Sequence, residues 1–413
     1  MIRVKAAPAS GGNFICRSLF HIRLAVRCPG EGNAVTRSTM IERSCPADGR
    51  SGASVPGPER NDRLRGRIED LIAERAVPGI QYLVVDAAGI LGNHAAGWAD
   101  VAGRRPMEPG TTMMLYSMTK TFTAAAVLHL VEAGRVGLED PVRTHVPSIP
   151  YGDAVTVRRL LSQTSGIPNP IPLKWVHAAE EHPQFDEPAA LDAVLRGNRN
   201  LKFAPGTRYG YSNIGYWLLG RVVERAGGMA FEAFLRKNLF DRLGMASSEI
   251  GLVIPSPPRH AKGYLPKYSF LNLAKPLLMD PRFFGPAEDR WLQIRDHYPN
   301  GPAFGGIVAS GRALAAFLQD QLRERPALFS RETRALFHQQ QKNTAGEPVP
   351  MTLGWHIGAS GSRRFLYKEG GGGGFHGAMR IYPAEGIAAM VIANDATFRA
   401  GRFLDAVDGE FMG

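Results

Sequence analysis

Cysteine is nearly absent from this sequence. The 413 residues include three cysteines, Cys16, Cys28 and Cys45, and none follows Cys45. The rest of the chain therefore has no disulfide, no cysteine-bound zinc and no cysteine nucleophile. A run of about 18 apolar residues is also missing, so no membrane-spanning helix is expected. The motifs H-E-x-x-H and G-x-S-x-G do not occur, which leaves a metalloprotease or an α/β-hydrolase without support.

Positive charge is in excess but is not concentrated. The formal net charge is +11, and residues 1–60 carry nine Lys and Arg against four Asp and Glu, which leaves +6 for the remaining chain. Those charges are scattered, without a basic block interleaved with aromatic residues. Such a distribution is typical of a solvated surface and not of a phosphate-binding face, so no nucleic-acid partner is expected.

The bulk composition is that of a globular protein, with 44% hydrophobic and 21% charged residues. A chain of 413 residues exceeds the usual size of a single domain. One large enzyme of two parts, or two domains, is therefore expected.

The first 60 residues differ in character from the rest. Residues 46–58 are rich in Gly, Pro, Ser and Ala, which predicts a flexible linker before the folded part. The first 30 residues are basic and lack acids, as in a transit peptide, and a translation start at Met40 or later explains them equally well. The stretch from Ser18 to Val26 is too short for a signal-peptide core, which favours a cytoplasmic location. We expect residues 1–60 to be a disordered or mis-assigned extension.

Hydrophobic spacing from residue 61 onward predicts strands at both ends of the folded part and helices between them. A first helix begins near Asn61 and ends before Pro78-Gly79, and the run from Met114 to Ala133 predicts a long helix buried on most of its faces. Strand-like runs cover residues 80–85, 90–96, 353–357, 364–368, 378–382 and 387–393.

One antiparallel sheet, built from both chain ends and flanked by helices, accounts for this order of elements. We expect an α/β (α+β) fold in one domain over residues 61–413. Its sheet part would cover about 61–140 and 301–413, with an all-helical domain inserted at about 141–300. Within the insertion, residues 251–300 are rich in proline and aromatic residues without periodicity, which predicts ordered loops.

Ser117 and Lys120 are candidate catalytic residues at the start of the long buried helix. Their spacing of three places both side chains on one helical face. A lysine held in apolar surroundings loses its proton more easily, and the neutral amine can take the proton of a serine hydroxyl. The motif S-x-x-K alone is weak, because an ordinary serine and a surface lysine match it equally.

Two further motifs strengthen this interpretation. Tyr211-Ser212-Asn213 precedes a helical run, and Lys368-Glu369-Gly370 ends a strand-like run. With Ser117 and Lys120 they resemble, in order and spacing, the S-x-x-K, Y-x-N and K-T-G motifs of serine β-lactamases and penicillin-binding proteins. Y-x-N in the middle position is similar to class C β-lactamases, D-alanyl-D-alanine peptidases and their related esterases.

The resemblance covers residues 61–413 and implies a β-lactamase/transpeptidase-like fold with the active site between its two parts. Further segments that look like the family are residues 77–80, 138–142, 160–166, 205–207, 243–245 and 305–307.

The resemblance also implies roles for the motif residues. Tyr211 would be the partner base or proton relay, and the alternative is a buried tyrosine with a satisfied hydroxyl. Asn213 would hydrogen-bond Lys120 or the substrate, or would cap the following helix. Lys368 would lend positive charge near Tyr211, or would be a solvated residue at a strand end.

Glycines 370–374 form a run that lets a substrate approach the backbone. The resemblance implies that Gly371 donates its backbone N–H to the oxyanion together with Ser117, with Gly370 completing the motif. The run also fits G-x-G-x-x-G, but a strand-like run follows it, so no dinucleotide site or other cofactor is expected.

Glu369 departs from the family pattern, which has a hydroxyl residue there. A carboxylate facing the cleft would repel an anionic β-lactam, and we therefore expect a carboxylesterase acting on a small-molecule ester through an acyl-enzyme. The alternatives are a β-lactamase or D-alanyl-D-alanine carboxypeptidase and, in another class, a catalytically silent binding protein. The oligomeric state is left open.

Removal of residues 1–55 should leave the fold and the hydrolytic activity intact, because linker-like composition and the family resemblance both place the start of the folded part near Asn61. Thermal melting and turnover of the full-length and shortened proteins test this. A shortened protein that fails to fold, or that loses activity, would contradict the prediction.

Overall fold

The computed structural model describes residues 57–412 except residues 75, 171–174, 270–271 and 273–278. The three cysteines and the expected extension and linker up to residue 56 lie outside the described residues. Residues 57–60, which we expected to belong to the extension, form instead the start of the first helix, so that helix begins earlier than predicted.

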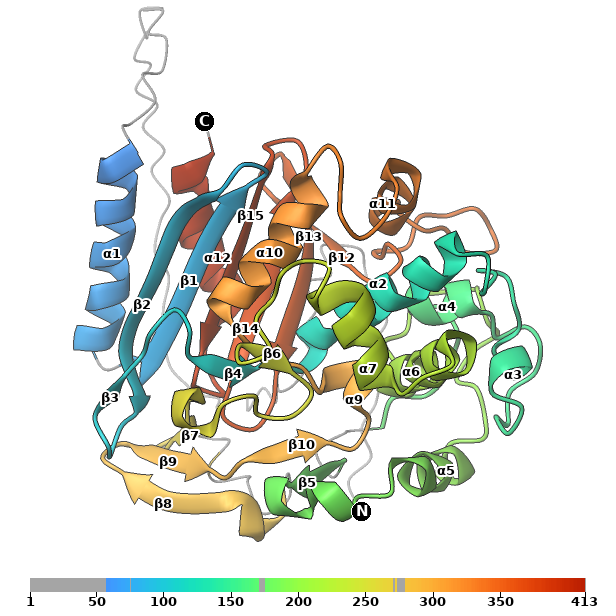
Figure 1. Ribbon diagram of the computed structural model, residues 1–413, viewed down its shortest axis with the longest axis horizontal. Coiled ribbons are helices and arrows are strands. Elements are labelled where there is room, and N and C mark those ends of the chain that lie inside the picture. Colours follow the sequence, from blue (N-terminus) through green and yellow to red (C-terminus); the bar gives the residue numbers. More distant parts are fainter. Residues whose placement is uncertain (1–56, 75, 171–174, 270–271, 273–278, 413) are drawn as a thin grey trace, which may run out of the picture. The chain divides into compact units, whose positions relative to one another are not determined.

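A seven-stranded antiparallel sheet organises the described part of the chain (Figure 1). Its strand order is β12-β13-β14-β15-β1-β2-β3, so early and late segments of the sequence lie side by side. The register joins them directly, with Ile80 opposite Ala393 and Asp86 opposite Ile387. This confirms the predicted sheet built from both chain ends. The strands are β1 (Gly79–Asp86), β2 (Ile90–Asp100), β3 (Arg105–Pro106), β12 (His356–Ser360), β13 (Arg363–Gly371), β14 (His376–Tyr382) and β15 (Ile387–Ala393).

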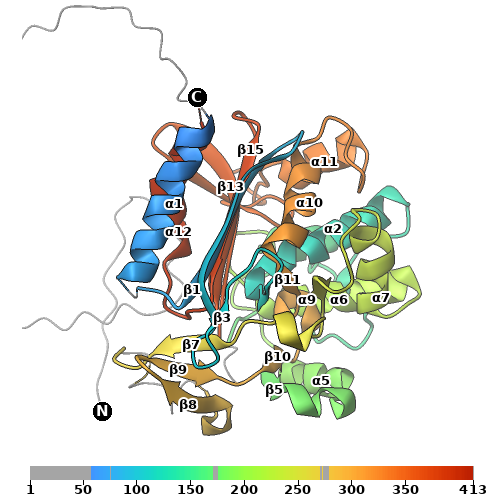
Figure 2. The ribbon, with the colours of Figure 1, turned by 60° about the vertical axis from the view of Figure 1, so that its left-hand side comes forward.

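Helices cover both faces of this sheet (Figure 2). On one face lie α1 (Gly57–Ala73) and α12 (Ala400–Val407), whose apolar residues share a core with Tyr82 and Val84. On the other face lie α2 (Thr119–Glu132) and α10 (Gly311–Leu322), which share a core with Leu83 and Val85. The rings of Phe122 in α2 and Phe317 in α10 stack with centroids 4.1 Å apart. Burial of these two layers fixes α2 behind the sheet, where it presents its first turn to the end of β13.

The remaining helices pack around α2 on the side away from α1 (Figure 1). Among them α6 follows Tyr211, and its N-terminus is capped by Ser212, whose hydroxyl accepts from the N–H of Gly215 at 3.1 Å. The helices are α3 (Val142–His145), α4 (Val157–Leu161), α5 (Glu187–Gly197), α6 (Asn213–Gly227), α7 (Phe231–Leu235), α9 (Pro302–Gly305) and α11 (Arg331–His338).

The region at residues 141–300 is not all-helical, contrary to the sequence expectation, and residues 251–300 are not merely loops. Three small sheets take part of it, with strand orders β4-β11-β6, β10-β5 and β7-β9-β8. Their strands are two to five residues long, and β8 includes a glycine and a proline, so no alternation of apolar residues marks them in the sequence. The strands are β4 (Thr112–Met114), β5 (Val176–Ala178), β6 (Ile250–Gly251), β7 (Gly263–Pro266), β8 (Phe284–Glu288), β9 (Trp291–Ile294), β10 (His297–Pro299) and β11 (Val308–Ser310).

The long helix predicted from Met114 is shorter than expected. Met114 ends β4, and a 3₁₀ turn, η1 (Tyr116–Met118), precedes α2. Tyr116 has a φ of 45°, which breaks the helical path and cannot be read from an apolar pattern. The burial of α2 on most of its faces is confirmed. At the other end of the chain, the predicted strand at residues 387–393 matches β15 residue for residue.

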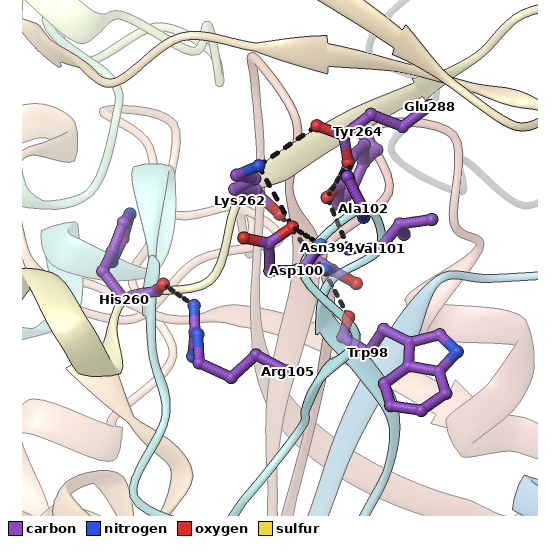
Figure 3. Close-up of polar contacts among 11 residues, drawn as sticks. Trp98, Asp100, Val101, Ala102, Arg105, His260, Lys262, Tyr264, Glu288 and Asn394 are labelled. Atoms are coloured by element: carbon purple, nitrogen blue, oxygen red, sulfur yellow. Dashed lines mark hydrogen bonds and ion pairs between the residues drawn. The ribbon is translucent and has the colours of Figure 1, made fainter.

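An ion-pair network joins the small sheet of β7, β8 and β9 to the turn after β2 (Figure 3). The Lys262 ammonium lies 3.0 Å from Oδ1 of Asp100 and 3.1 Å from Oε1 of Glu288. The Tyr264 hydroxyl accepts from the N–H of Val101 and donates to Oε2 of Glu288, both at 2.8 Å. The Glu288 side chain is only 5% exposed, so these partners offset the cost of burying its charge. The network ties the small sheet to the edge of the large one.

Candidate active site

Ser117 lies in the 3₁₀ turn η1, directly before the first turn of α2. Its Oγ is 2.7 Å from the hydroxyl oxygen of Tyr211 and accepts a hydrogen bond from Nζ of Lys120 at 2.9 Å. The serine oxygen therefore lies between two groups that can exchange protons with it, one from α2 and one from the segment before α6.

Lys120 is fully buried within α2. Its Nζ donates to the carbonyl oxygen of Phe304 at 2.6 Å as well as to Ser117, and it lies 5.0 Å from the centre of the Tyr211 ring. Burial, and secondly the positive charge of Lys368, hold the pKa of Lys120 well below its ordinary value. A lysine in this state is neutral over more of the pH range, and a neutral amine can accept the proton of Ser117.

Tyr211 packs between Ser117 and two buried basic side chains. The Nζ of Lys368 lies 5.4 Å from the centre of its ring, slightly farther than that of Lys120. The Tyr211 hydroxyl, 2.7 Å from the Ser117 oxygen, is within reach to exchange a proton with it.

Asn213 is buried at the first position of α6 but does not cap the helix, since Ser212 does. The carboxamide oxygen of Asn169 accepts from both the backbone N–H and Nδ2 of Asn213, each at 3.0 Å. The backbone N–H can only donate, which fixes the orientation of both carboxamides. Oδ1 of Asn213 is buried and, in the described part of the chain, has no hydrogen-bond partner. The expected bond to Lys120 is not among the contacts observed.

The K-T-G-like segment forms the end of β13, and its residues alternate between the two faces of the sheet. Lys368 is fully buried on the face toward Tyr211. Gly370 faces the same way, and a Cβ there would lie 3.0 Å from the backbone nitrogen of Ser117, so only glycine permits this approach. Gly371 lies next in the strand and lines the cleft beside Ser117.

Glu369 points away from this cleft, which removes the basis of the expected repulsion between its carboxylate and a substrate. Its Oε1 lies 3.3 Å from Nε2 of His376, the residue opposite Gly371 in β14. Burial raises the pKa of the Glu369 carboxyl and lowers that of His376 to about 4. The pleat of the strand, which puts Lys368 toward Tyr211, necessarily puts its neighbour Glu369 on the other face.

His356 is a buried neighbour of the site that sequence reasoning missed. Its ring stacks on that of Tyr211 with centroids 6.2 Å apart, and its Nε2 lies 3.0 Å from the hydroxyl of Tyr209. Burial, then the proximity of the basic side chains of Lys368 and Lys120, hold its pKa well below the ordinary value, so it adds no positive charge beside Tyr211. No motif surrounds it, and only its position on the strand next to β13 could have indicated it.

The Ser117 hydroxyl opens onto a cleft of about 540 Å³, part of which is open to solvent. Its lining is mainly apolar and aromatic. The lining residues are Tyr116, Ser117, Trp175, Val176, Asn213, Met279, His297, Pro299, Phe304, Gly305 and Gly371 to Gly373.

Neither a metal centre nor a membrane span is evident in the part of the chain that the structure describes. There, no three His, Cys, Asp or Glu residues are grouped as metal ligands would be. No helix of that part combines the length and the apolar character that crossing a membrane requires.

A buried lysine one turn after a serine, in a cleft at the end of an antiparallel sheet, defines a class of serine hydrolases that use no histidine–aspartate pair. The chain belongs to the Beta-lactamase family, whose model matches residues 64–409. The resemblance noted in the sequence is thereby confirmed.

Two bacterial relatives show the range of similarity. Penicillin-binding protein 4* of Bacillus subtilis is 32% identical over 187 residues, which are 44% of this chain and 41% of that protein. Protein flp of Staphylococcus aureus strain MW2 is 25% identical over 339 residues, 79% of this chain and 61% of that protein. The matched part of the chain thus spans less than two thirds of either relative.

Solved structures share the fold. The octameric penicillin-binding protein homologue from Pyrococcus abyssi has a TM-score of 0.69 at 24% identity, over 84% of this chain and 76% of that one. The D-amino acid amidase from Ochrobactrum anthropi SV3 has a TM-score of 0.71 at 21% identity, over 85% of this chain and 98% of that one.

Replacing Lys368 by Met should move the acidic limb of the pH profile of kcat/KM to higher pH. The amine of Lys120 must be neutral to accept a proton, so activity rises as pH passes upward through its pKa. Loss of the nearby positive charge removes one of the two causes that lower this pKa. Lys237→Met, the same change at an exposed site, is the control. An acidic limb that stays in place, or moves to lower pH, would show that Lys368 does not act on Lys120.

Proposed function

We propose that this protein is a serine hydrolase that cleaves neutral carboxylic esters through an acyl-enzyme. Ser117 is the nucleophile, Lys120 its base and Tyr211 the proton carrier. The observation that supports this most directly is the position of the Ser117 oxygen, 2.9 Å from Lys120 Nζ and 2.7 Å from the Tyr211 hydroxyl. Both distances are within the range for direct proton transfer.

In the first step, neutral Lys120 takes the hydroxyl proton of Ser117 as the serine oxygen attacks the ester carbonyl carbon. The carbonyl oxygen gains negative charge and accepts hydrogen bonds from the backbone N–H groups of Ser117 and Gly371. The bond to the alcohol then breaks. Tyr211 gives a proton to the leaving alkoxide and recovers one from Lys120, so an acyl-enzyme and a neutral alcohol remain.

In the second step, water attacks the acyl carbon and the same groups act in reverse. Tyr211 and Lys120 take a proton from the water and return one to the Ser117 oxygen as the acyl bond breaks. A carboxylic acid leaves, and the enzyme returns to its starting state. Lys368 keeps its place behind Tyr211 and stabilises negative charge on the phenol oxygen throughout.

The lining of the cleft favours a neutral substrate with an apolar acyl group. Trp175, Val176 and Phe304 supply apolar walls, and no Asp, Glu, Lys or Arg is among the described lining residues. A substrate carboxylate entering this cleft would lose water without gaining a charged partner there, which is costly. The charge of Glu369 has no part in this preference, because its carboxylate lies beside His376 on the other face of the strand. A β-lactam or a peptide amide remains the alternative substrate, since the same serine can attack either carbonyl.

Ser117→Ala should abolish turnover, on the order of 10⁴-fold or more, because the hydroxyl is the only group that bonds covalently to the substrate. Lys120→Ala should remove most of the activity, because the serine loses its base. Steady-state rates with a chromogenic ester measure both. Labelling of the wild type by a fluorophosphonate probe, absent in Ser117→Ala, excludes a catalytically silent binding protein. Near-normal turnover by Ser117→Ala would refute the mechanism.

The wild type should have a higher kcat/KM for a neutral short-chain ester than for a cephalosporin. Glu369→Thr should leave the ratio of the two unchanged, because the Glu369 carboxylate contacts His376 on the far side of the strand. Comparable rates for the two wild-type substrates would refute the ester preference and favour the β-lactam alternative. A ratio that changes in Glu369→Thr would show that its charge reaches the substrate.

A further inference from the structure

Tyr116, the residue before the nucleophile, holds an unfavourable backbone conformation. Its φ of 45° places it in the left-handed region, where a bulky side chain is strained. Glycine or asparagine would adopt this conformation more easily. The side chain is 7% exposed and lies at the wall of the cleft. The contacts of the aromatic side chain must therefore compensate for the strain of the backbone.

Those contacts join two separate segments of the site. The Tyr116 hydroxyl donates to the carbonyl oxygen of Gly373 at 2.7 Å, and its ring packs on Gly372, where a Cβ would lie 2.5 Å from a ring carbon. Tyr116 thus reaches from the nucleophile turn η1 across to the glycine run that follows β13.

His297 of β10 holds the hydroxyl from the other side. Its Nδ1 donates to the carbonyl oxygen of Arg295 at 2.8 Å, which leaves Nε2 as an acceptor 3.1 Å from the Tyr116 hydroxyl oxygen. The single hydroxyl proton of Tyr116 thus lies between two acceptors, this nitrogen and the carbonyl oxygen of Gly373. The two rings are 6.3 Å apart between centroids and nearly parallel, at 30°. The histidine is buried at the wall of the cleft, and the bond to Arg295 fixes the orientation of its ring.

The two proposed oxyanion donors belong to the two segments that Tyr116 joins. The N–H of Ser117 follows Tyr116 directly, and the N–H of Gly371 lies two residues before Gly373. An oxyanion hole works only if both donors lie about 3 Å from the developing charge at the same time. The distance between the two donors therefore depends on how firmly η1 and the glycine run are held together.

We propose that Tyr116, supported by His297, is a positioning residue that sets the spacing of the two oxyanion donors. This inference rests on the proposed function, since it assumes hydrolysis by Ser117. The inference extends the proposed function by assigning roles to Tyr116 and His297, which lie outside the S-x-x-K, Y-x-N and K-T-G motifs. The strain at Tyr116 is retained because contact with Gly372 requires an aromatic ring at this position, and the bond to the carbonyl oxygen of Gly373 requires a hydroxyl at the end of that ring.

The main test is Tyr116→Phe, which keeps the ring on Gly372 and deletes only the hydroxyl. A weakened oxyanion hole lowers kcat while leaving ground-state binding unchanged, so we expect kcat to fall by about tenfold or more with KM little altered. Phenylboronic acid, which forms a tetrahedral adduct with an active serine, should lose affinity by the same factor as kcat/KM. A merely structural tyrosine would not link these two quantities.

Tyr151→Phe is the matched control, because the Tyr151 hydroxyl also donates to a backbone carbonyl, that of Asn198, at 2.7 Å. Its melting temperature should fall about as much as that of Tyr116→Phe, with kcat unchanged. As a second variant, His297→Gln keeps a polar atom near the Tyr116 hydroxyl and should retain more activity than His297→Leu.

The outcomes separate the two proposals. If the wild type neither hydrolyses esters nor reacts with a fluorophosphonate, the function and the positioning role both fail. If the wild type is active but Tyr116→Phe keeps its kcat and its affinity for phenylboronic acid, the positioning role fails and the function stands. Equal loss of kcat in Tyr116→Phe and Tyr151→Phe would likewise overturn the positioning role.

Discussion

Burial of the Lys120 amine is the constraint on which the rest of the site depends. Removing an ammonium ion from water costs on the order of several kcal/mol, and a second buried lysine close by adds repulsion. The protein lowers this cost by letting Lys120 lose its proton easily, and that same property suits it to the role proposed for it, a base toward Ser117. A neutral amine beside a serine hydroxyl is favoured by three features: the apolar helix α2, the aromatic rings around Nζ and the position of Lys368.

The sheet explains how residues almost 250 positions apart meet at this amine. Ser117 lies in η1 and Lys120 in the helix α2 that follows it, and Lys368 belongs to β13, which reaches the same point from the opposite end of the chain. Tyr211 arrives on a third segment, set by the capped start of α6. Because β13 runs directly past η1, where Gly370 permits the close approach, Ser117, Lys120 and Lys368 are held together by the packing of main elements.

Sequence alone predicted which residues meet at the site better than it predicted their surroundings. Ser117, Lys120 and Tyr211 could be named because their motifs have fixed spacing, and β15 because its apolar run is continuous. The side of the sheet on which Glu369 lies could not be predicted. A shift of one residue along a strand moves a side chain to the opposite face of the sheet, and the motif does not indicate which of its residues faces the cleft. The strands between residues 176 and 299 are too short for periodicity, and the left-handed Tyr116 leaves no trace in composition.

The Lys262 network gives the two sides of the cleft different sensitivities to the surrounding solution. Dissolved salt screens charges that are partly exposed, as Lys262 and Asp100 are, whereas apolar packing of the large sheet against its helices is not weakened by screening. The sheet held by this network also contacts the glycine run, through the N–H of Tyr264 and the carbonyl oxygen of Gly374 at 3.1 Å. The glycine run thus contacts a sheet whose attachment includes partly exposed ion pairs, and we expect ionic strength to affect this side of the cleft more than the side formed by the large sheet and its helices.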